Sequence, residues 1–248
     1  MGGVNDAENA AALEVRRVCY ENGLLLDDLQ LGRLSEYARL LLEWNSRINL
    51  ISRKDEGNLW LGHILHSLSP LFRFAIPERT KVVDLGSGGG LPGIPIAVAR
   101  PGIDVVLLDS IAKKTTALGS MVLQLGLANA HVATGRAEEI ASERSHGAAY
   151  DIVLARAVAP LVDLLLWARP LLNRGPVKRS LPAPGPPGAR GAASMPCLLA
   201  LKGGDLEGEV RLAKLKRPEW DLAVEDLVFA GSARAGLMEK KLVIATPR

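Results

Sequence analysis

The sequence contains few of the residues that mark secreted, membrane-spanning and metal-binding proteins. Of its 248 residues only two are cysteine, Cys19 and Cys197, and they form neither a disulfide framework nor a C-x-x-C zinc motif. No apolar run approaches the roughly 18 residues that a membrane-spanning helix needs. From these scarcities we expect no metal site and no membrane segment.

The N-terminal residues also lack a targeting signal. They read MGGVNDAENAA, without the apolar stretch of a secretory signal peptide. Asp6 stands where a myristoylation motif requires Ser or Thr. We therefore expect a cytoplasmic protein.

Charge of one sign and aromatic residues are scarce as well. The formal net charge is +3 and aromatics make up 4% of the chain, so neither a basic character nor a base-stacking platform indicates nucleic acid. The basic residues do gather in clumps, such as Lys113 with Lys114 and KLKR at 214–217. Such clumps are compatible with a local RNA-binding face, although solvated surface lysines explain each of them equally well.

The prominent feature of the chain is a glycine-rich loop. Residues 82–93 read VVDLGSGGGLPG, and the apolar segment IPIAVA follows at once. A buried strand that ends in a glycine-rich turn and feeds a helix presents backbone N–H groups to a ligand. This pattern predicts an enzyme that binds a nucleoside cofactor.

Two classes of cofactor use this architecture. Gly88, Gly90 and Gly93 satisfy the dinucleotide pattern G-x-G-x-x-G, but a segment so rich in glycine matches many patterns. A dinucleotide site places its first glycine directly at the strand end, where this chain has Asp84. An acid there would repel a pyrophosphate and suit the cationic groups of S-adenosylmethionine. The alternative is that Asp84 only caps a turn.

Five further positions complete the expected cofactor site. Gly86 and Gly88 let the backbone approach the methionine part of the cofactor, which a Cβ would obstruct. A ribose-binding acid is expected about 20 residues beyond the first glycine, where Asp109 closes the next strand; a helix N-cap is its alternative role. Ala137 and Glu138 follow the third strand, where an adenine ring lies in this fold, although Glu138 could also be a solvated surface acid.

The chain divides into a helical part and an alternating part. Helical segments are predicted at 6–22, 27–48 and 58–74, with Pro70 bending or ending the last. From Lys81 the alternation of strands and helices predicts a parallel sheet. The expected strands are 81–84, 104–109, 130–134, 151–155, 197–202, 221–229 and 240–246, with helices near 112–125, 159–172 and 206–216. We expect a helical cap at 1–78 and a catalytic domain at 79–248.

One segment departs from this pattern. Residues 175–196 hold six of the fifteen prolines, four glycines and no acid. Such a composition neither buries apolar area nor forms a strand ladder, so we expect a surface loop that is dispensable for chemistry. A basic arm that steers RNA is the alternative.

Seven motifs of the chain resemble those of the bacterial 16S ribosomal RNA guanine-N7 methyltransferases, the RsmG or GidB family. They are NLIS at 49–52, HILHSL at 63–68, DLGSGGGLPGIP at 84–95, LLDSIAKK at 107–114, GRAEE at 135–139, ARAVAP at 155–160 and ALKGG at 200–204. The resemblance covers most of the chain. It implies a Rossmann-like class I methyltransferase with a seven-stranded, mostly parallel sheet, helices on both faces and an N-terminal helical cap.

The resemblance also implies a reaction and further site residues. The cofactor would be S-adenosylmethionine, the substrate 16S ribosomal RNA or the small ribosomal subunit, and the protein a monomer. Leu91 and Arg156 would join the cofactor pocket, and His63 would belong to a motif that links the cap to the catalytic domain. In members of the family the chain runs directly from the helix before Gly175 into the ALKG strand, so 175–196 resembles an insertion.

The chemistry needs no general base, because guanine N7 carries a free lone pair that attacks the sulfonium methyl directly. No catalytic residue is therefore assigned, and proximity and alignment supply the rate. Lys202, at the end of the fifth strand, could contact phosphate or guanine O6. His63 and His66 lie three positions apart, a spacing that could serve a metal, but packing or hydrogen bonding is favoured because no third ligand is recognisable.

Two other functions remain open from the sequence. One is a nicotinamide-dependent oxidoreductase, which the G-x-G-x-x-G match favours. The other is a non-catalytic RNA-binding regulator on a methyltransferase fold, which the intact acids and glycines argue against.

Overall fold

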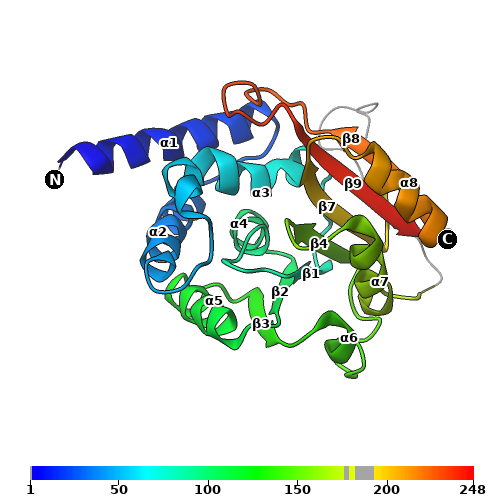
Figure 1. Cartoon of the computed structure of the whole chain (residues 1–248). Helices are drawn as coiled ribbons and strands as arrows, with labels where there is room; N and C mark the ends of the chain where they lie inside the picture. The colour runs from blue at the N-terminus through cyan, green and yellow to red at the C-terminus, as the bar shows by residue number, and fades with distance from the viewer. Residues whose placement is uncertain (1, 176–178, 182–192) are drawn as a thin grey trace.

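A seven-stranded sheet forms the centre of the molecule. The computed structural model describes residues 2–175, 179–181 and 193–248. The strands of this sheet are β1 (Lys81–Leu85), β2 (Asp104–Asp109), β3 (Ala130–Thr134), β4 (Ile152–Arg156), β7 (Cys197–Gly203), β8 (Trp220–Asp226) and β9 (Lys240–Pro247). Their order across the sheet is β3-β2-β1-β4-β7-β9-β8 (Figure 1).

The sheet is parallel except at one strand. The pairs β1–β2, β2–β3, β1–β4 and β4–β7 are parallel, and β9 runs antiparallel to both β7 and β8. The strand order reverses between β1 and β4, so the loops that follow these strands diverge and leave a crevice at their carboxyl ends. This edge is where a ligand is expected in such a sheet.

Helices cover both faces of the sheet. On one face lie α1 (Gly2–Glu21), α2 (Asp28–Asn45), α3 (His66–Leu68), α4 (Gly93–Ala99) and α5 (Ala112–Gln124). The other face carries α6 (Ala137–Ile140), α7 (Leu161–Leu171) and α8 (Glu207–Lys216). Alternate residues of the strands separate into two cores, since Val82 packs with the first set of helices and Val83 with the second. The expected fold class is confirmed.

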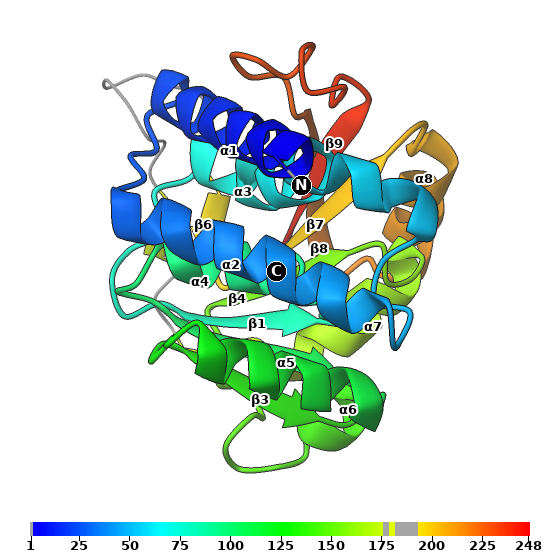
Figure 2. The ribbon, with the colours of Figure 1, turned by 90° about the vertical axis from the view of Figure 1, so that its left-hand side faces the viewer.

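The helices that precede β1 pack directly on the glycine-rich loop and the helix after it. The buried Tyr37 hydroxyl on α2 donates to the Gly89 carbonyl at 2.9 Å, and the Gln30 amide donates to the Val98 carbonyl at 3.0 Å. Figure 2 shows α1, α2 and α5 lying across this side of the molecule. The cap and the sheet thus share one hydrophobic core, and a boundary at residue 78 stays a prediction.

Two of the predicted helices end differently in the structure. The helix expected to reach residue 48 stops at Asn45, because the Asn45 side chain accepts the backbone N–H groups of Leu50 and Ile51 and turns the chain. The single helix predicted over 58–74 was wrong. It is replaced by the 3₁₀ turn η1 (Arg53–Asn58), the π-helical turns η2 (Leu59–Leu65), α3 and the 3₁₀ turn η3 (Ser69–Phe72), whose first turn contains Pro70.

The segment 175–196 was predicted to form no ladder and to bury nothing, and both expectations fail at its ends. Strands β5 (Arg179–Leu181) and β6 (Ala193–Met195) pair antiparallel, and Met195 is only 2% exposed. Met195 is buried because it ends β6, which lies against β9 two residues before the central strand β7. Residues 176–178 and 182–192 lie outside the described part. Because Met195 is buried, the stretch that we expect to be dispensable ends before it.

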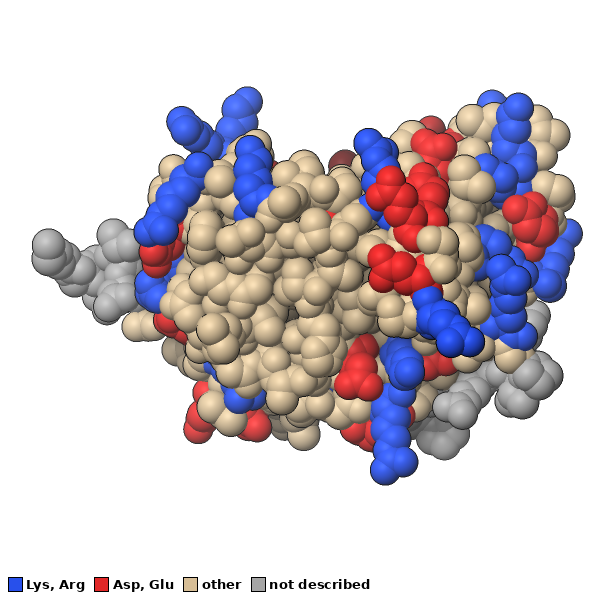
Figure 3. All heavy atoms as spheres, turned by 90° about the horizontal axis from the view of Figure 1, so that it is seen from below, with Lys and Arg blue, Asp and Glu red and all other residues tan. Residues whose placement is uncertain are grey.

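Charge is distributed unevenly over the surface. Seen from below, basic and acidic side chains mix on the right-hand side of the molecule, while the centre of this face is largely uncharged (Figure 3). This face therefore offers no continuous basic surface. Within the described residues, no helix is long and apolar enough to cross a membrane.

Candidate functional site

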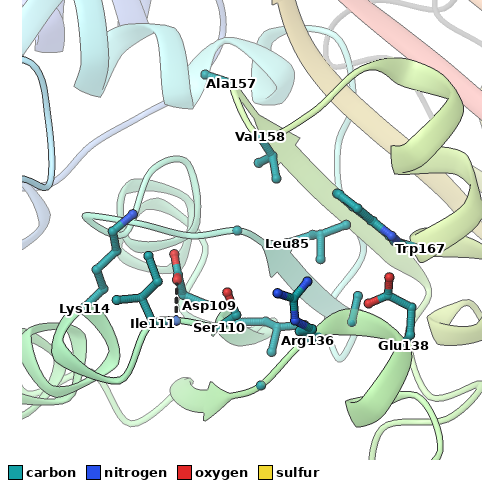
Figure 4. A pocket seen from close by; sticks show the side chains of 14 residues that line it. Leu85, Asp109, Ser110, Ile111, Lys114, Arg136, Glu138, Ala157, Val158 and Trp167 are labelled. Carbon is teal, nitrogen blue, oxygen red and sulfur yellow. Dashed lines mark hydrogen bonds between the residues drawn. The ribbon is translucent and has the colours of Figure 1, made fainter.

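A cavity of about 290 Å³ opens at the carboxyl ends of β1, β2, β3 and β4 (Figure 4). It is lined by Leu85, Gly86, Leu108, Asp109, Ser110, Ile111, Lys114, Gly135, Arg136, Ala137, Glu138, Ala157, Val158 and Trp167. Four of the residues expected in the cofactor site are among them, namely Gly86, Asp109, Ala137 and Glu138. They come from three different loops, which the reversal of strand order brings to one edge of the sheet.

The loop after β1 requires a glycine at its first position. Gly86 has φ +70°, and a Cβ there would come within 2.7 Å of the Val158 side chain from the loop after β4. The N–H groups of Gly86 and Ser87 both donate to the Leu108 carbonyl on β2, at 2.8 and 2.9 Å. The loop is therefore held against β2, and the absence of a side chain at Gly86 lets Val158 pack closely against it.

Asp109 connects two of the loops. Its carboxylate is 6% exposed and accepts the Gly88 N–H at 2.9 Å and the Ile111 N–H at 2.9 Å. Gly88 itself is not among the residues that line the cavity, so its part in the site is carried by this bond. Asp109 thus fixes the loop and also faces the cavity, with lone pairs left for a ligand hydroxyl.

Asp84 turns away from the cavity. It is fully buried, and its Oδ2 accepts the Ser87 hydroxyl at 2.5 Å and the Gly93 N–H at 2.9 Å. Within the described residues, its Oδ1 has no hydrogen-bond partner. These contacts fit the turn-capping alternative. They also weaken a dinucleotide site, because the N–H at the start of α4 is already bound to a carboxylate.

Burial raises the pKa of Asp84 from its ordinary 3.8 to about 6, against the lowering effect of its hydrogen bonds to Ser87 and Gly93. Between these two pH values the folded chain binds more protons than the unfolded chain. The contribution of Asp84 to stability is therefore full at low pH and is lost as pH rises through about 6.

We expect the substitution Asp84→Asn to remove the loss of stability that Asp84 causes as pH rises through about 6. A neutral amide keeps an oxygen for Ser87 and Gly93 but carries no charge to desolvate. Urea unfolding at pH 8 should give a free energy of unfolding about 1–3 kcal/mol above wild type, with the gap closing near pH 4. A variant that is less stable than wild type at pH 8 would contradict this assignment.

The adenine end of the expected site contains an aromatic residue that sequence analysis missed. Trp167 on α7 lines the cavity opposite Glu138 (Figure 4). Ala137 is buried beside it at the start of α6, and Glu138 is exposed. Trp167 lies within a helix without any motif, so only the packing of α7 on the sheet places it here.

Leu91 and Arg156 are not among the residues that line this cavity. Leu91 is 5% exposed and belongs to the core under the helical face. Arg156 ends β4 as expected, but its guanidinium donates to His63 Nδ1 at 2.7 Å, on the far side of Ala157. The positions expected from family resemblance therefore divide between the cavity and its surroundings.

The Lys202 ammonium is already bound within the protein. It lies 2.7 Å from Glu209 on α8 and donates to the Ala159 carbonyl at 2.8 Å. Glu209 in turn accepts the Leu161 N–H at the start of α7. Lys202 therefore holds the loop after β4, and the contact with phosphate or guanine O6 considered for it is not favoured by these bonds.

The sheet and the cavity define a class of protein. Counted along the chain, the strands of the sheet stand in the order 3-2-1-4-5-7-6 with the seventh antiparallel, which is the Rossmann-like class I methyltransferase fold. The solved structure of cofactor-bound Rv0187 from MTB shares this fold with a TM-score of 0.50 at 16% identity, covering 88% of this chain and 89% of that one.

Sequence comparison identifies the family. A family model described as rRNA small subunit methyltransferase G (GidB) matches residues 30–177. The ribosomal RNA small subunit methyltransferase G of Chlorobium luteolum is 40% identical over 88% of this chain and 81% of its own length. That of Chlorobium phaeobacteroides is 35% identical over 96% of each chain. The chain belongs to the rRNA small subunit methyltransferase G family.

Proposed function

We propose that this protein is an S-adenosylmethionine-dependent methyltransferase that acts on N7 of a guanine in 16S ribosomal RNA. Membership of the methyltransferase G family carries the proposal. The location of the cavity agrees with it, because class I methyltransferases bind their cofactor at the carboxyl ends of the first strands.

The residues of the cavity fit S-adenosylmethionine. The backbone of Gly86 lines the cavity and lies close to the methionine part, and the Asp109 carboxylate accepts the ribose hydroxyls. Ala137 and Trp167 supply an apolar end for the adenine, beside Glu138. Gly88 and Leu91 do not line the cavity. Gly88 supports it through its hydrogen bond to Asp109, and Leu91 supports it by packing in the core.

Bound S-adenosylmethionine supplies a methyl group on a sulfonium sulfur. N7 of guanine carries a free lone pair, so no residue of the chain has to remove a proton. What the chain contributes is the alignment of the two reactants and the exclusion of water, which accounts for the absence of an obvious general base.

Mass mapping of 16S ribosomal RNA tests the proposal. RNA from cells with and without the gene should differ by one N7-methylguanine, and purified protein should restore it in small subunits from the deleted strain. A modification at another atom or in another RNA would contradict the proposed reaction. A subunit that gains no methyl group, although the protein binds S-adenosylmethionine, would contradict the substrate.

If the RNA lies over the cofactor cavity, removing the charge of Lys113 should weaken RNA binding, whereas removing the charge of Lys216 should not. Lys113 is exposed at the start of α5, on the cofactor edge, whereas Lys216 ends α8 near Trp220. Trp220 is the first residue of β8 and pairs with Pro247, at the end of the sheet opposite to the cofactor cavity. The basic residues at 214–217 therefore lie away from the cofactor cavity, and Lys216 serves as a control.

We expect Lys113→Gln to raise the KM for the RNA substrate severalfold and to reduce the salt dependence of binding. The magnitude of the slope of log binding constant against log salt concentration should fall by about 0.7–0.9 for the loss of one phosphate contact. Lys216→Gln should leave both unchanged. Filter binding and steady-state kinetics at several salt concentrations measure this, and equal slopes for both variants would contradict it.

A further inference from the structure

A second cavity, of about 370 Å³, adjoins the cofactor cavity. The two share Ala157, which lines both of them in the loop after β4. Ala157 has φ 54°, a left-handed conformation that costs energy in a residue other than glycine. The chain therefore turns sharply where the cavities meet, and a group in the second cavity would face the cofactor across this turn.

The second cavity is lined mainly by polar side chains. They are Asp55 and Asn58 from η1, His63 and His66 from the following turns, Arg156 from β4, Lys202 from β7 and Lys240 from β9. Three cations and one carboxylate thus meet at one end of the sheet. The side chains from the turns, those of Asp55, Asn58, His63 and His66, do not line the cofactor cavity.

Arg156 sets the protonation of His63. Because a guanidinium only donates hydrogen bonds, His63 Nδ1 must accept at 2.7 Å, and the ring hydrogen then lies on Nε2. Burial, with the charge of Arg156 beside it, lowers the pKa of His63 to about 4, so the ring is neutral. His63 Nε2 is 3.9 Å from Asp55 Oδ2, which leaves that carboxylate close to a donor but not in a hydrogen bond.

His66 is an unsatisfied polar group beside this cavity. It is 5% exposed, and its Nε2 has no hydrogen-bond partner among the residues that the structure describes. Burial lowers the pKa of His66 to about 3, so the ring is neutral. A buried polar atom without a partner is costly, and this one belongs to a ring that lines this cavity.

The cations of this cavity are not equally available to a ligand. Glu209 and the Ala159 carbonyl hold the Lys202 ammonium, and His63 holds the Arg156 guanidinium. Lys240 is the first residue of β9, opposite Gly203, and has no ion pair in the described part of the chain. Asp55 and Lys240 are therefore the acceptor and the donor that a ligand would meet.

We propose that the second cavity receives the target guanine, turned out of the RNA, and that Asp55 recognises its Watson–Crick edge. This inference rests on the proposed function and names the substrate subsite. Guanine presents two donors, N1–H and the 2-amino group, on the edge that a carboxylate accepts, and a carbonyl oxygen, O6, for Lys240. Adenine presents an acceptor at N1, which the Asp55 carboxylate would repel.

The same carboxylate favours the transfer step. The N7 lone pair forms the new bond to the methyl carbon while the bond from that carbon to sulfur breaks, so the positive charge passes from sulfur to the purine ring. No proton is gained or lost. A purine that becomes cationic donates more strongly from N1–H, so Asp55 binds the transition state more tightly than the substrate. Asp55 should therefore affect kcat as well as KM.

Small subunits that lack the modification, and the nucleotides GMP and 7-methyl-GMP, are the probes. Asp55→Asn keeps the shape of the side chain but loses the second acceptor and the charge. Asp104→Asn is its matched control, exposed at the opposite end of the sheet. The variant Lys240→Gln is compared with the control Lys241→Gln, because the Lys241 ammonium is already bound to Asp226.

We expect Asp55→Asn to lower kcat on small subunits about 10- to 100-fold, the range for loss of a bidentate contact to a base. Its affinity for S-adenosylmethionine and its melting temperature should match those of Asp104→Asn. By calorimetry, wild type should prefer 7-methyl-GMP over GMP, and Asp55→Asn should lose this preference. Lys240→Gln should raise the KM for subunits, and Lys241→Gln should not.

Three results would overturn the inference. One is an Asp55→Asn protein with wild-type kcat. Another is a loss of S-adenosylmethionine affinity or stability equal to the loss of activity, which would make Asp55 structural. The third is tighter binding of subunits after Asp55→Asn, which would mean that the cavity holds a phosphate. Failure of wild type to methylate subunits would instead contradict the proposed function, and the nucleotide comparison would still test the cavity.

Discussion

We expect the Gly86→Val protein to bind S-adenosylmethionine about 100-fold more weakly than wild type. Its Cβ would lie 2.7 and 2.8 Å from the two methyl carbons of Val158, so one of these two loops must shift and change the cavity wall that both residues form. A β-branched residue also resists the φ of +70°. Crowding and strain of about 3 kcal/mol correspond to two factors of ten in affinity.

Titration calorimetry measures this effect, and Gly119→Ala is the control. Gly119 lies within α5, where an added Cβ would meet nothing within 4 Å. That substitution should leave affinity unchanged and stabilise the helix by about 0.5–1 kcal/mol. Gly86→Ala should fall between the two. Unchanged affinity in Gly86→Val would show that the cofactor does not pass over this glycine.

Asp109→Ala should reduce both cofactor affinity and stability. The substitution removes the acceptor for two partly buried backbone N–H groups, those of Gly88 and Ile111. We expect the free energy of unfolding to fall by about 1–3 kcal/mol. The affinity for S-adenosylmethionine should fall about 100-fold, because the ribose contact and the loop that frames the methionine are lost together.

Two variants separate these effects. Asp109→Asn keeps one oxygen, so it should retain part of the stability while still losing affinity. Asp104→Ala, at the other end of β2, should change neither quantity. Urea unfolding and calorimetry on the same samples give both numbers. If Asp109→Ala lost stability but bound the cofactor as wild type does, the carboxylate would be only a loop anchor.

The large sheet was predictable because its strands are buried on both faces. Such strands form continuous apolar runs, and the run before Gly86 and the run that ends at Asp109 have the bounds expected within one residue. The short helix α6 was not predicted, because four residues carry no periodicity. The turns between 53 and 72 were missed because they change between 3₁₀, π and α geometry within a few residues, which an apolar spacing of helical period does not reveal.

The site was predictable only where strand ends determine it. Gly86 and Asp109 follow β1 and β2 directly, so the sheet alone brings them together. Trp167 and Asp55 come from a helix and a turn that have no such rule, and their positions depend on tertiary packing. Arg156 was placed correctly at the end of β4, but its partner His63 lies 93 residues away in the chain and decides which cavity it faces.

The bond from Tyr37 to Gly89 has a consequence for how the chain is made on the ribosome. The helices of the cap emerge first, yet the surface that buries Tyr37 is completed only when α4 and the strands have been synthesised. At about 5–20 residues per second the cap waits several seconds with its apolar side exposed. A pause in translation before β4 has left the exit tunnel would lengthen this exposure.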